Sequence, residues 1–151
     1  MEWMLMPLRR YAEFSGRSRR MEYWMFTLFI VIVMAVLGAL MAAGGLLAVM
    51  EAESAGATPE PPGPLFWVGL VPLMLFFLAI IVPGIAVAVR RFHDRDMSGW
   101  WYLGFIVLGA IPYIGFIASI ASLVIMCLPG TPGPNRFGPD PLDPSSAEVF
   151  A

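Results

Sequence analysis

Long segments of this sequence lack any charged side chain, and this absence is its most informative feature. Three apolar stretches, residues 23–49, 65–89 and 100–128, contain no Asp, Glu, Lys or Arg. About 20 apolar residues suffice for a helix to cross the ~30 Å hydrocarbon layer of a bilayer, and each stretch is longer than that. The sequence therefore predicts an integral membrane protein, in keeping with its mean hydropathy of +0.77.

Other absences disfavour whole classes of protein. The single cysteine, Cys127, excludes an internal disulfide and cannot supply a metal cluster. The three stretches have no ionisable residue at membrane depth and no inverted repeat is visible, which disfavours ion-coupled transporters. No nucleophile–base pair or metal-ligand spacing is apparent, so we expect neither an enzyme nor a cofactor. Nucleic acid is not expected, because no basic groove with interleaved aromatic residues is present.

The arginines predict the orientation, because basic residues are retained on the cytoplasmic side during insertion. The amino-terminal segment, residues 1–22, has five arginines, the first loop, residues 51–64, has none, and the second loop, residues 90–99, has three. We therefore expect a cytoplasmic amino terminus, with residues 1–22 forming a short interfacial helix, and a first loop outside. No cleaved signal is expected, since the first apolar run begins only at Tyr23.

The third stretch is ambiguous. As one straight helix its 29 residues would run ~43 Å, and Pro112 near its middle removes an intrahelical hydrogen bond. A single kinked span and a re-entrant hairpin that turns at Pro112 both fit. We expect the span, since each half of a hairpin is too short to cross and its tip would expose unpaired backbone. The expected fold is thus an all-α membrane bundle of three transmembrane helices in one domain, residues 1–141, with a flexible tail at 142–151.

Small residues recur at helical spacing in two of the stretches. Ala35, Ala39 and Ala43 lie four residues apart in the first, and Gly115 and Ser119 repeat the spacing in the third. Such faces let another helix approach closely. The expected partners are therefore a second copy of the chain or a larger membrane protein, together with a bilayer that carries anionic headgroups.

Three polar segments flank the apolar stretches. They read FSGRSRRMEYW at residues 14–24, RRFHDRDMSGWW at 90–101 and GTPGPNRFGPDP at 130–141. Together they resemble the three signatures of one bacterial group, the domain of unknown function 805 family of YhaH-type inner-membrane proteins, over about residues 10–141. The resemblance implies a multi-pass protein of the bacterial inner membrane and brings no activity, cofactor or catalytic residue. The chain departs from shorter members by a longer Pro/Glu-rich first loop and a longer third stretch.

The candidate functional residues all lie in these three segments. They are Gly16, Arg17, Arg20, Glu22, Arg91, His93, Asp94, Asp96, Gly99, Trp100, Asn135, Arg136 and Gly138. His93, Asp94 and Asp96 form the most enzyme-like group, since an imidazole beside two carboxylates can do acid–base work or hold a cation. An ordinary polar turn has the same composition, and we interpret the group as structural.

Our hypothesis for this group is an ion pair between Asp94 or Asp96 and Arg17 or Arg20, which would tie the amino-terminal segment to the second loop. Reversing both charges, at Asp94 and Arg17 together, should then restore the expression lost in either single variant. The function that we predict is a non-enzymatic structural or interaction module of the membrane. The alternative is a small transporter, channel or lipid-handling protein in which the polar group gates or binds.

Overall fold

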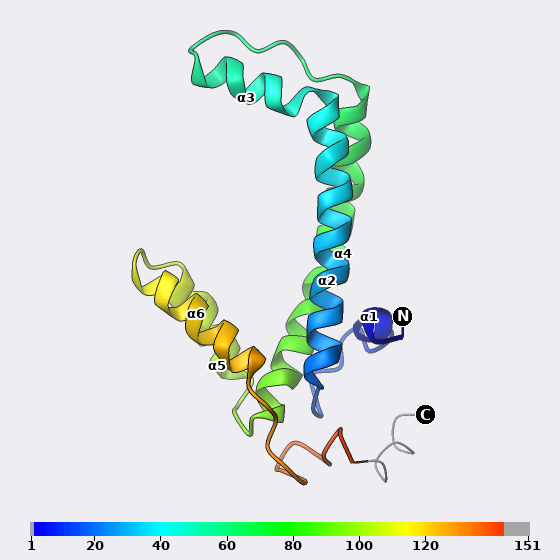
Figure 1. Cartoon of the computed structure of the whole chain (residues 1–151), viewed down its shortest axis with the longest axis vertical. Coiled ribbons are helices and arrows are strands. Elements are labelled where there is room, and N and C mark those ends of the chain that lie inside the picture. Colours follow the sequence, from blue (N-terminus) through cyan, green and yellow to red (C-terminus); the bar gives the residue numbers. More distant parts are fainter. Residues whose placement is uncertain (1, 144–151) are drawn as a thin grey trace. The chain divides into compact units, whose positions relative to one another are not determined.

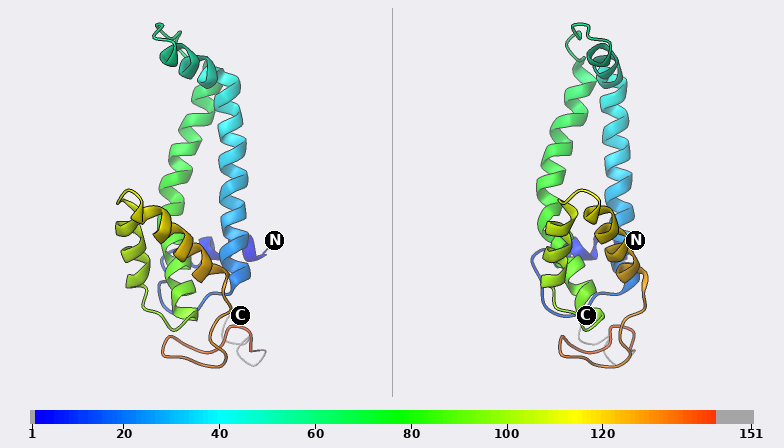
Figure 2. Two further views of the ribbon diagram at one scale, coloured as in Figure 1. Left: turned by 60° about the vertical axis from the view of Figure 1, so that its left-hand side comes forward. Right: turned by 90° about the vertical axis from the view of Figure 1, so that its left-hand side faces the viewer.

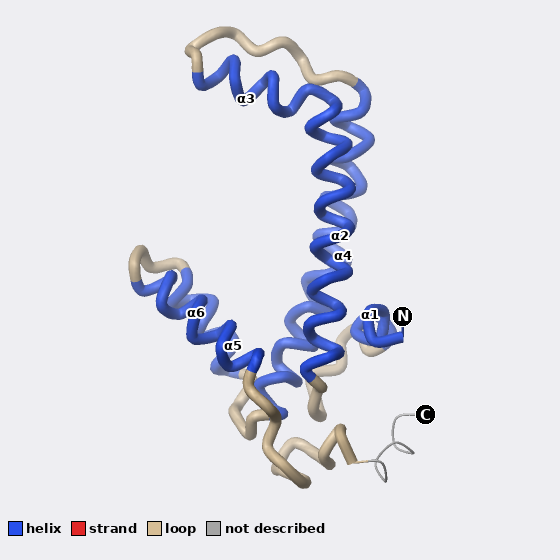
Figure 3. The backbone as a smooth tube through the Cα atoms, in the orientation of Figure 1, coloured by secondary structure: helices blue, strands red, loops and turns tan. Residues whose placement is uncertain are grey.

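The computed structural model describes residues 2–143, and these residues form helices and loops without a strand (Figures 1 and 3). In chain order the helices are α1 (Glu2–Arg9), α2 (Arg20–Met41), the π-helical η1 (Ala42–Leu46), α3 (Leu47–Ser54), α4 (Pro64–Asp94), α5 (Trp100–Gly109) and α6 (Ile114–Cys127). The all-α prediction is confirmed for this part of the chain. The predicted flexible tail at 142–151 falls outside the described residues from residue 144 onward.

The chain divides into two compact units. Unit 1 comprises residues 2–26 and 82–143 of the described chain, and unit 2 comprises residues 27–81. The long helices α2 and α4 each contribute to both units, so the division runs through helices and not through linkers. The single membrane domain expected for residues 1–141 stays a prediction.

In unit 2, α2 and α4 run side by side in both views of Figure 2. Two glycines allow their close approach. A Cβ added to Gly44 would lie 2.5 Å from the Phe66 Cα, and one added to Gly69 would lie 2.8 Å from the Leu37 carbonyl oxygen. The alanine face predicted from the sequence, Ala35, Ala39 and Ala43, is instead exposed. Its contact with another membrane helix stays a prediction.

The first apolar stretch ends earlier than the sequence suggests. Gly45 has a φ of 104°, a left-handed conformation that only glycine adopts readily, and it kinks the helical path within η1. The predicted segment 23–49 is therefore helical without interruption only up to this glycine. Part of the expected first loop, up to Ser54, is helical as α3.

The second stretch extends beyond its predicted end. Helix α4 runs to Asp94, so Arg90, Arg91, His93 and Asp94 lie on its last turns and not in a loop, as the sequence analysis assumed. Side chains three and four residues apart on a helix share a face. This helical geometry places Arg91 beside Asp94 and makes the site described below.

Two helical runs, Arg20–Ser54 and Pro64–Asp94, are long and apolar enough to cross a membrane, with mean hydropathies of 2.7 and 2.8 over their most apolar windows. Only 6% of each window is buried. A core helix of a water-soluble protein would bury most of such a surface. The exposure of these apolar helices therefore fits lipid as their solvent.

The third stretch is not one helix. Helices α5 and α6 form a hairpin and lie side by side in Figure 2, and the turn between them contains Pro112 and Tyr113, which has a φ of 64°. A Cβ on Gly115 would lie 3.0 Å from the Gly109 carbonyl carbon, so glycine allows the two helices to meet. The expected single kinked span over 100–128 is wrong for this structure, and the hairpin alternative describes it. Proline lacks the N–H that a continuous helix needs, and the turn follows from that loss.

Candidate functional site

Unit 1 buries five charged side chains, each at most 4% exposed: Arg17, Glu22, Arg90, Arg91 and Asp94. We call them the charge cluster. They come from the segment before α2, from the first turn of α2 and from the last turns of α4. Buried charges are costly unless they are paired and hydrogen-bonded, so their partners determine whether the site is stable.

Asp94 lies between two arginines. The Arg17 Nε donates to Asp94 Oδ1 at 2.9 Å, and the Arg91 Nη1 donates to Oδ2. Each carboxylate oxygen thus accepts one charge-assisted hydrogen bond. Of the pairings that the sequence left open, Asp94 or Asp96 with Arg17 or Arg20, the structure contains that of Asp94 with Arg17, whereas Asp96 pairs with Arg136.

Arg17 also joins the cluster to the Gly/Pro-rich segment at residues 129–141. Its Nη1 and Nη2 donate to the carbonyl oxygens of Gly133 and Thr131, each at 2.6 Å. The Thr131 N–H donates in turn to the Asp94 carbonyl oxygen at 2.8 Å. A Cβ on Gly130 would lie 2.6 Å from Asp94 Cγ, so the segment can pass this close to the carboxylate only with glycine there.

Glu22 and Arg90 hold the start of α2 against α4. The Arg90 Nη2 donates to Glu22 Oε1 at 2.7 Å, and the Ser18 hydroxyl donates to Glu22 Oε2 at 2.7 Å. The Ser18 N–H donates to the Arg90 carbonyl oxygen at 3.2 Å, and Arg90 Nη1 donates to the Glu13 carbonyl oxygen at 3.0 Å. Both carboxylates of the charge cluster are therefore fully engaged.

The carboxyl end of α6 is capped by arginines. Arg91 donates to the carbonyl oxygens of Met126 and Leu128, Arg20 to that of Cys127 and Arg95 to that of Pro129. The last carbonyls of a helix have no partner within the helix, and cations there also complement the helix dipole. The arginines thus attach the hairpin to α4 and to the start of α2.

His93 is held by the two other signature segments. Its Nδ1 lies 3.1 Å from the Gly16 carbonyl oxygen, and its ring stacks on Phe137 with 3.9 Å between the ring centroids. The Asn135 side-chain amide donates to the His93 carbonyl oxygen at 2.9 Å. Gly16, with a φ of 80°, supplies a backbone turn that a larger residue rarely adopts.

The Gly/Pro-rich segment is also closed on itself. Asn135 and Gly138 exchange backbone hydrogen bonds at 3.0 and 3.1 Å, and Gly138 has a φ of 143°. Asp140 accepts hydrogen bonds from the backbone N–H groups of Leu142 and Gly133, each at 2.9 Å. The bond from Leu142 lowers the pKa of the Asp140 carboxyl most, and the nearby charges of Arg17 and Arg19 act in the same direction.

The remaining candidates lie at the periphery. Asp96 and Arg136 form an exposed ion pair at 3.1 Å, and Trp100 is 77% exposed. Gly99 packs against Val89, whose Cγ1 would lie 2.6 Å from a Cβ at that position. The candidates predicted from the sequence therefore include both buried and exposed residues. The sequence alone does not show which charged side chains of a polar segment are buried.

Several residues of the site were not among the candidates: Ser18, Arg90, Gly130, Thr131 and Gly133. A sequence signal exists for some of them. Ser18 precedes Glu22 by four residues, one helical turn, and Gly130 and Gly133 belong to the repeating Gly/Pro pattern. Nothing in the sequence distinguishes Arg90 from its neighbour Arg91. The two side chains leave α4 in different directions, so Arg90 pairs with Glu22 and Arg91 with Asp94.

The two buried carboxylates and the imidazole of the site all contact other groups of unit 1. Asp94 and Glu22 are saturated by arginines and Ser18, and one face of the His93 ring is covered by Phe137. Residues 2–143 contain no group of three or more His, Cys, Asp or Glu side chains that could hold a metal ion. The contacts of the site join the segment before α2, the last turns of α4 and the Gly/Pro-rich segment.

Comparison with known proteins identifies the family. The family described as "Protein of unknown function (DUF805)" matches residues 11–139. Inner membrane protein YhaI of Escherichia coli (strain K12) is 40% identical over 141 residues, which cover 93% of this chain and 96% of the relative. Inner membrane protein YhaH of the same strain is 39% identical over 141 residues, 93% of this chain and 97% of the relative. No solved structure matches the chain. The chain is a membrane protein that belongs to the DUF805 family.

Proposed function

We propose that the chain is a non-enzymatic membrane module with two transmembrane helices and a re-entrant hairpin. In this module the charge cluster joins the start of α2, the end of α4 and the Gly/Pro-rich segment on the cytoplasmic side. The observation that carries the proposal is the reach of Arg17, which contacts Asp94, Thr131 and Gly133 at once.

These contacts support the topology. Residues joined by hydrogen bonds lie on the same side of a bilayer, whose hydrocarbon layer is ~30 Å thick. A single span over residues 100–128 would separate Asp94 from Thr131 by that thickness. As helices, α5 and α6 extend about 15 and 21 Å, so both are too short to cross. A hairpin that enters and leaves on the same side fits both facts.

The distribution of charge supports the orientation. All nine arginines lie in unit 1, and none lies in unit 2, which contains Glu51, Glu53 and Glu60. Arginine-rich flanks stay in the cytoplasm. The arginine-bearing segments before α2 and at the end of α4 therefore belong on the cytoplasmic side, and the first loop, between α2 and α4, on the outer side. The relatives named as inner membrane proteins support the same membrane.

The contacts of the polar groups support a structural role over catalysis. A catalytic base must have an oxygen or nitrogen atom that can accept a proton from the substrate. Both carboxylate oxygens of Asp94 instead accept hydrogen bonds from arginines that are themselves buried. Removing one partner of a buried pair leaves an uncompensated charge, so the buried partners depend on one another for their arrangement. What the cluster holds in place is the hairpin and the Gly/Pro-rich segment.

Compartment-sensitive reporters test the proposal. A reporter at the amino terminus, one within residues 55–60 of the first loop and one at the carboxyl terminus should report cytoplasm, outside and cytoplasm in that order. A carboxyl-terminal reporter on the outside would overturn it, because Arg17 could not then reach Thr131. A reconstituted flux that depends on His93 or Asp94 would contradict the structural role and favour a small transporter or channel.

A further inference from the structure

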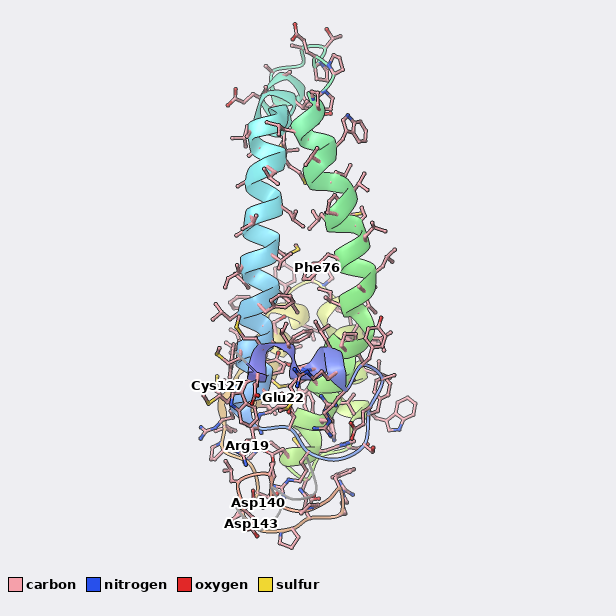
Figure 4. All side chains as sticks on the ribbon, turned by 90° about the vertical axis from the view of Figure 1, so that its right-hand side faces the viewer. Arg19, Glu22, Phe76, Cys127, Asp140 and Asp143 are labelled. Atoms are coloured by element: carbon pink, nitrogen blue, oxygen red, sulfur yellow. The ribbon has the colours of Figure 1, made fainter. Side chains whose placement is uncertain are left out.

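Unit 1 contains an open cavity of about 670 Å³ beside the charge cluster. Its walls come from α1, the first turns of α2 and the Gly/Pro-rich segment, and the residues that matter here are Trp3, Arg19, Arg20, Trp24, Met25 and Asp140. Figure 4 labels Arg19, Cys127 and Asp140, three of the residues that border it. The volume falls within the range of pockets that bind small molecules, ~300–1,000 Å³.

The charged residues of the cavity lining are two arginines, Arg19 and Arg20, and two aspartates, Asp94 and Asp140. Arg20 is exposed, and its Nη1 lies 3.3 Å from the Cys127 carbonyl oxygen, a long contact with a neutral acceptor. The Arg19 guanidinium lies over the Trp3 ring, 5.3 Å from its centroid. The ion pairs described within residues 2–143 are made by other arginines. Both guanidinium groups keep donors for an anion.

The two aspartates of the lining offset the positive charge only in part. Asp94 is bound to Arg17 and Arg91, which lie behind the wall of the cavity. Asp140 accepts two backbone N–H bonds from its own segment and keeps its negative charge, and it lies near Arg17 and Arg19, whose charges lower the pKa of its carboxyl. Four arginines therefore stand against two aspartates in and immediately behind the lining, so the cavity favours a ligand with net negative charge.

Most of the remaining lining is apolar, and part of it lies on a candidate transmembrane helix. Met21, Trp24 and Met25 follow Arg20 on the first turns of α2, where the candidate span begins. Tryptophan and arginine at the end of a span lie at the level of lipid headgroups. A ligand that contacts both the arginines and the apolar part of the lining has an anionic head and an apolar body.

We propose that this cavity binds one anionic glycerophospholipid, with its phosphate against Arg19 and Arg20 and its glycerol and first acyl carbons against Trp24 and Met25. The occupant is a lipid and not free phosphate, because the apolar wall continues onto the membrane-facing helix. The proposal rests on the placement of unit 1 at the bilayer surface, and it adds the ligand that unit 1 recognises there.

The test uses the full-length protein, delipidated in detergent, and native mass spectrometry to follow one bound lipid. Phosphatidylglycerol, phosphatidylcholine and inorganic phosphate are titrated separately. R19Q/R20Q removes the two cavity arginines, and R9Q/R136Q, the matched control, removes two exposed arginines of unit 1 that do not line the cavity. R20Q alone is a milder variant, since Arg20 is exposed and makes only the long contact with Cys127.

We expect the apparent Kd for phosphatidylglycerol to weaken about 30-fold in R19Q/R20Q and about fivefold in R20Q, because each basic group near a lipid phosphate contributes a similar factor. The control should change it about twofold or less, since separated exposed charges are screened. Phosphatidylcholine should bind more weakly, and inorganic phosphate should not compete.

Equal weakening in R19Q/R20Q and R9Q/R136Q would overturn the proposal in favour of general charge attraction. Competition by inorganic phosphate at matched concentration would overturn it in favour of a free-anion site. If R19Q/R20Q does not fold, R20Q decides: unchanged binding in R20Q overturns the proposal. Binding in detergent does not depend on orientation, so failure here and failure of the reporter experiment are distinguishable.

Discussion

Replacing Asp94 by asparagine should destabilise the protein severely while changing its shape very little. The substitution removes the charge shared by Arg17 and Arg91, whose side chains are at most 1% exposed. Breaking a buried pair by removal of one partner costs about 3–5 kcal/mol. For a chain of this size 1 kcal/mol shifts the unfolding midpoint by about 2–4 °C, so the Tm should fall by roughly 6–20 °C.

The control is the substitution Asp96→Asn, two positions further along the chain. Asp96 pairs with Arg136, and their side chains are 49% and 61% exposed. Exposed pairs contribute about 0–1 kcal/mol, so Asp96→Asn should lower the Tm by a few degrees at most. Thermal unfolding of the purified full-length variants in one detergent, followed by circular dichroism, measures both. Equal shifts for Asp94→Asn and Asp96→Asn would refute the buried charge cluster.

The structure also changes the rescue expected from the sequence. In the double reversal R17D/D94R, the carboxylate introduced at position 17 would face the carbonyl oxygens that Arg17 now serves, and the guanidinium introduced at position 94 would face Arg91. We therefore expect the reversed pair to remain as unstable as the single variants, although the native ion pair exists. Recovery of wild-type expression in R17D/D94R would show that the pair acts alone, without Thr131 and Gly133.

Three further predictions concern the same unit. Gly130→Ala should destabilise by about 1–3 kcal/mol through overlap with the Asp94 carboxylate, whereas Gly104→Ala, in open space on α5, should be neutral or stabilising; equal Tm values would contradict the close approach. Arg17→Lys should lower the Tm despite the retained charge, because an ammonium cannot reproduce the planar fork that serves three acceptors; an unchanged Tm would mean that charge alone suffices. The pKa of Asp140 lies below its usual 3.8, so its contribution is complete above that pH and is lost as the pH falls through the lowered value; Asp140→Asn should flatten the loss of stability below about pH 4 in an acid titration, and an unchanged acid profile would remove this role.

Much of the fold follows from local patterns in the sequence. An uninterrupted apolar run must be helical in lipid, since no water is present to satisfy its backbone groups. This rule predicts α2 and α4, and the turn in the third stretch lies where Pro112 removes an N–H. The ends of α2 and α4 were misjudged: the glycine at position 45 is a local signal for a break that the apolar run concealed, whereas nothing local to Arg90 shows that α4 continues to Asp94.

The choice between span and hairpin was wrong for a physical reason. From the sequence alone the hairpin leaves unpaired backbone and two short helices, both unfavourable in lipid. The tertiary structure supplies what the sequence could not display, namely the contact of Gly115 with Gly109 and the arginines that cap the end of α6. The short-range glycine contact and the long-range arginine contacts together favour the hairpin.

Composition and periodicity by themselves determined that the chain is helical and apolar and that its arginines gather in a few segments, because hydrophobicity and charge are properties of each residue. Only the tertiary structure decided that Asp94 lies between Arg17 and Arg91, and that Arg17 also reaches Thr131 and Gly133. Such partners are separated by up to 116 residues. Their pairing depends on packing directions that no local pattern encodes.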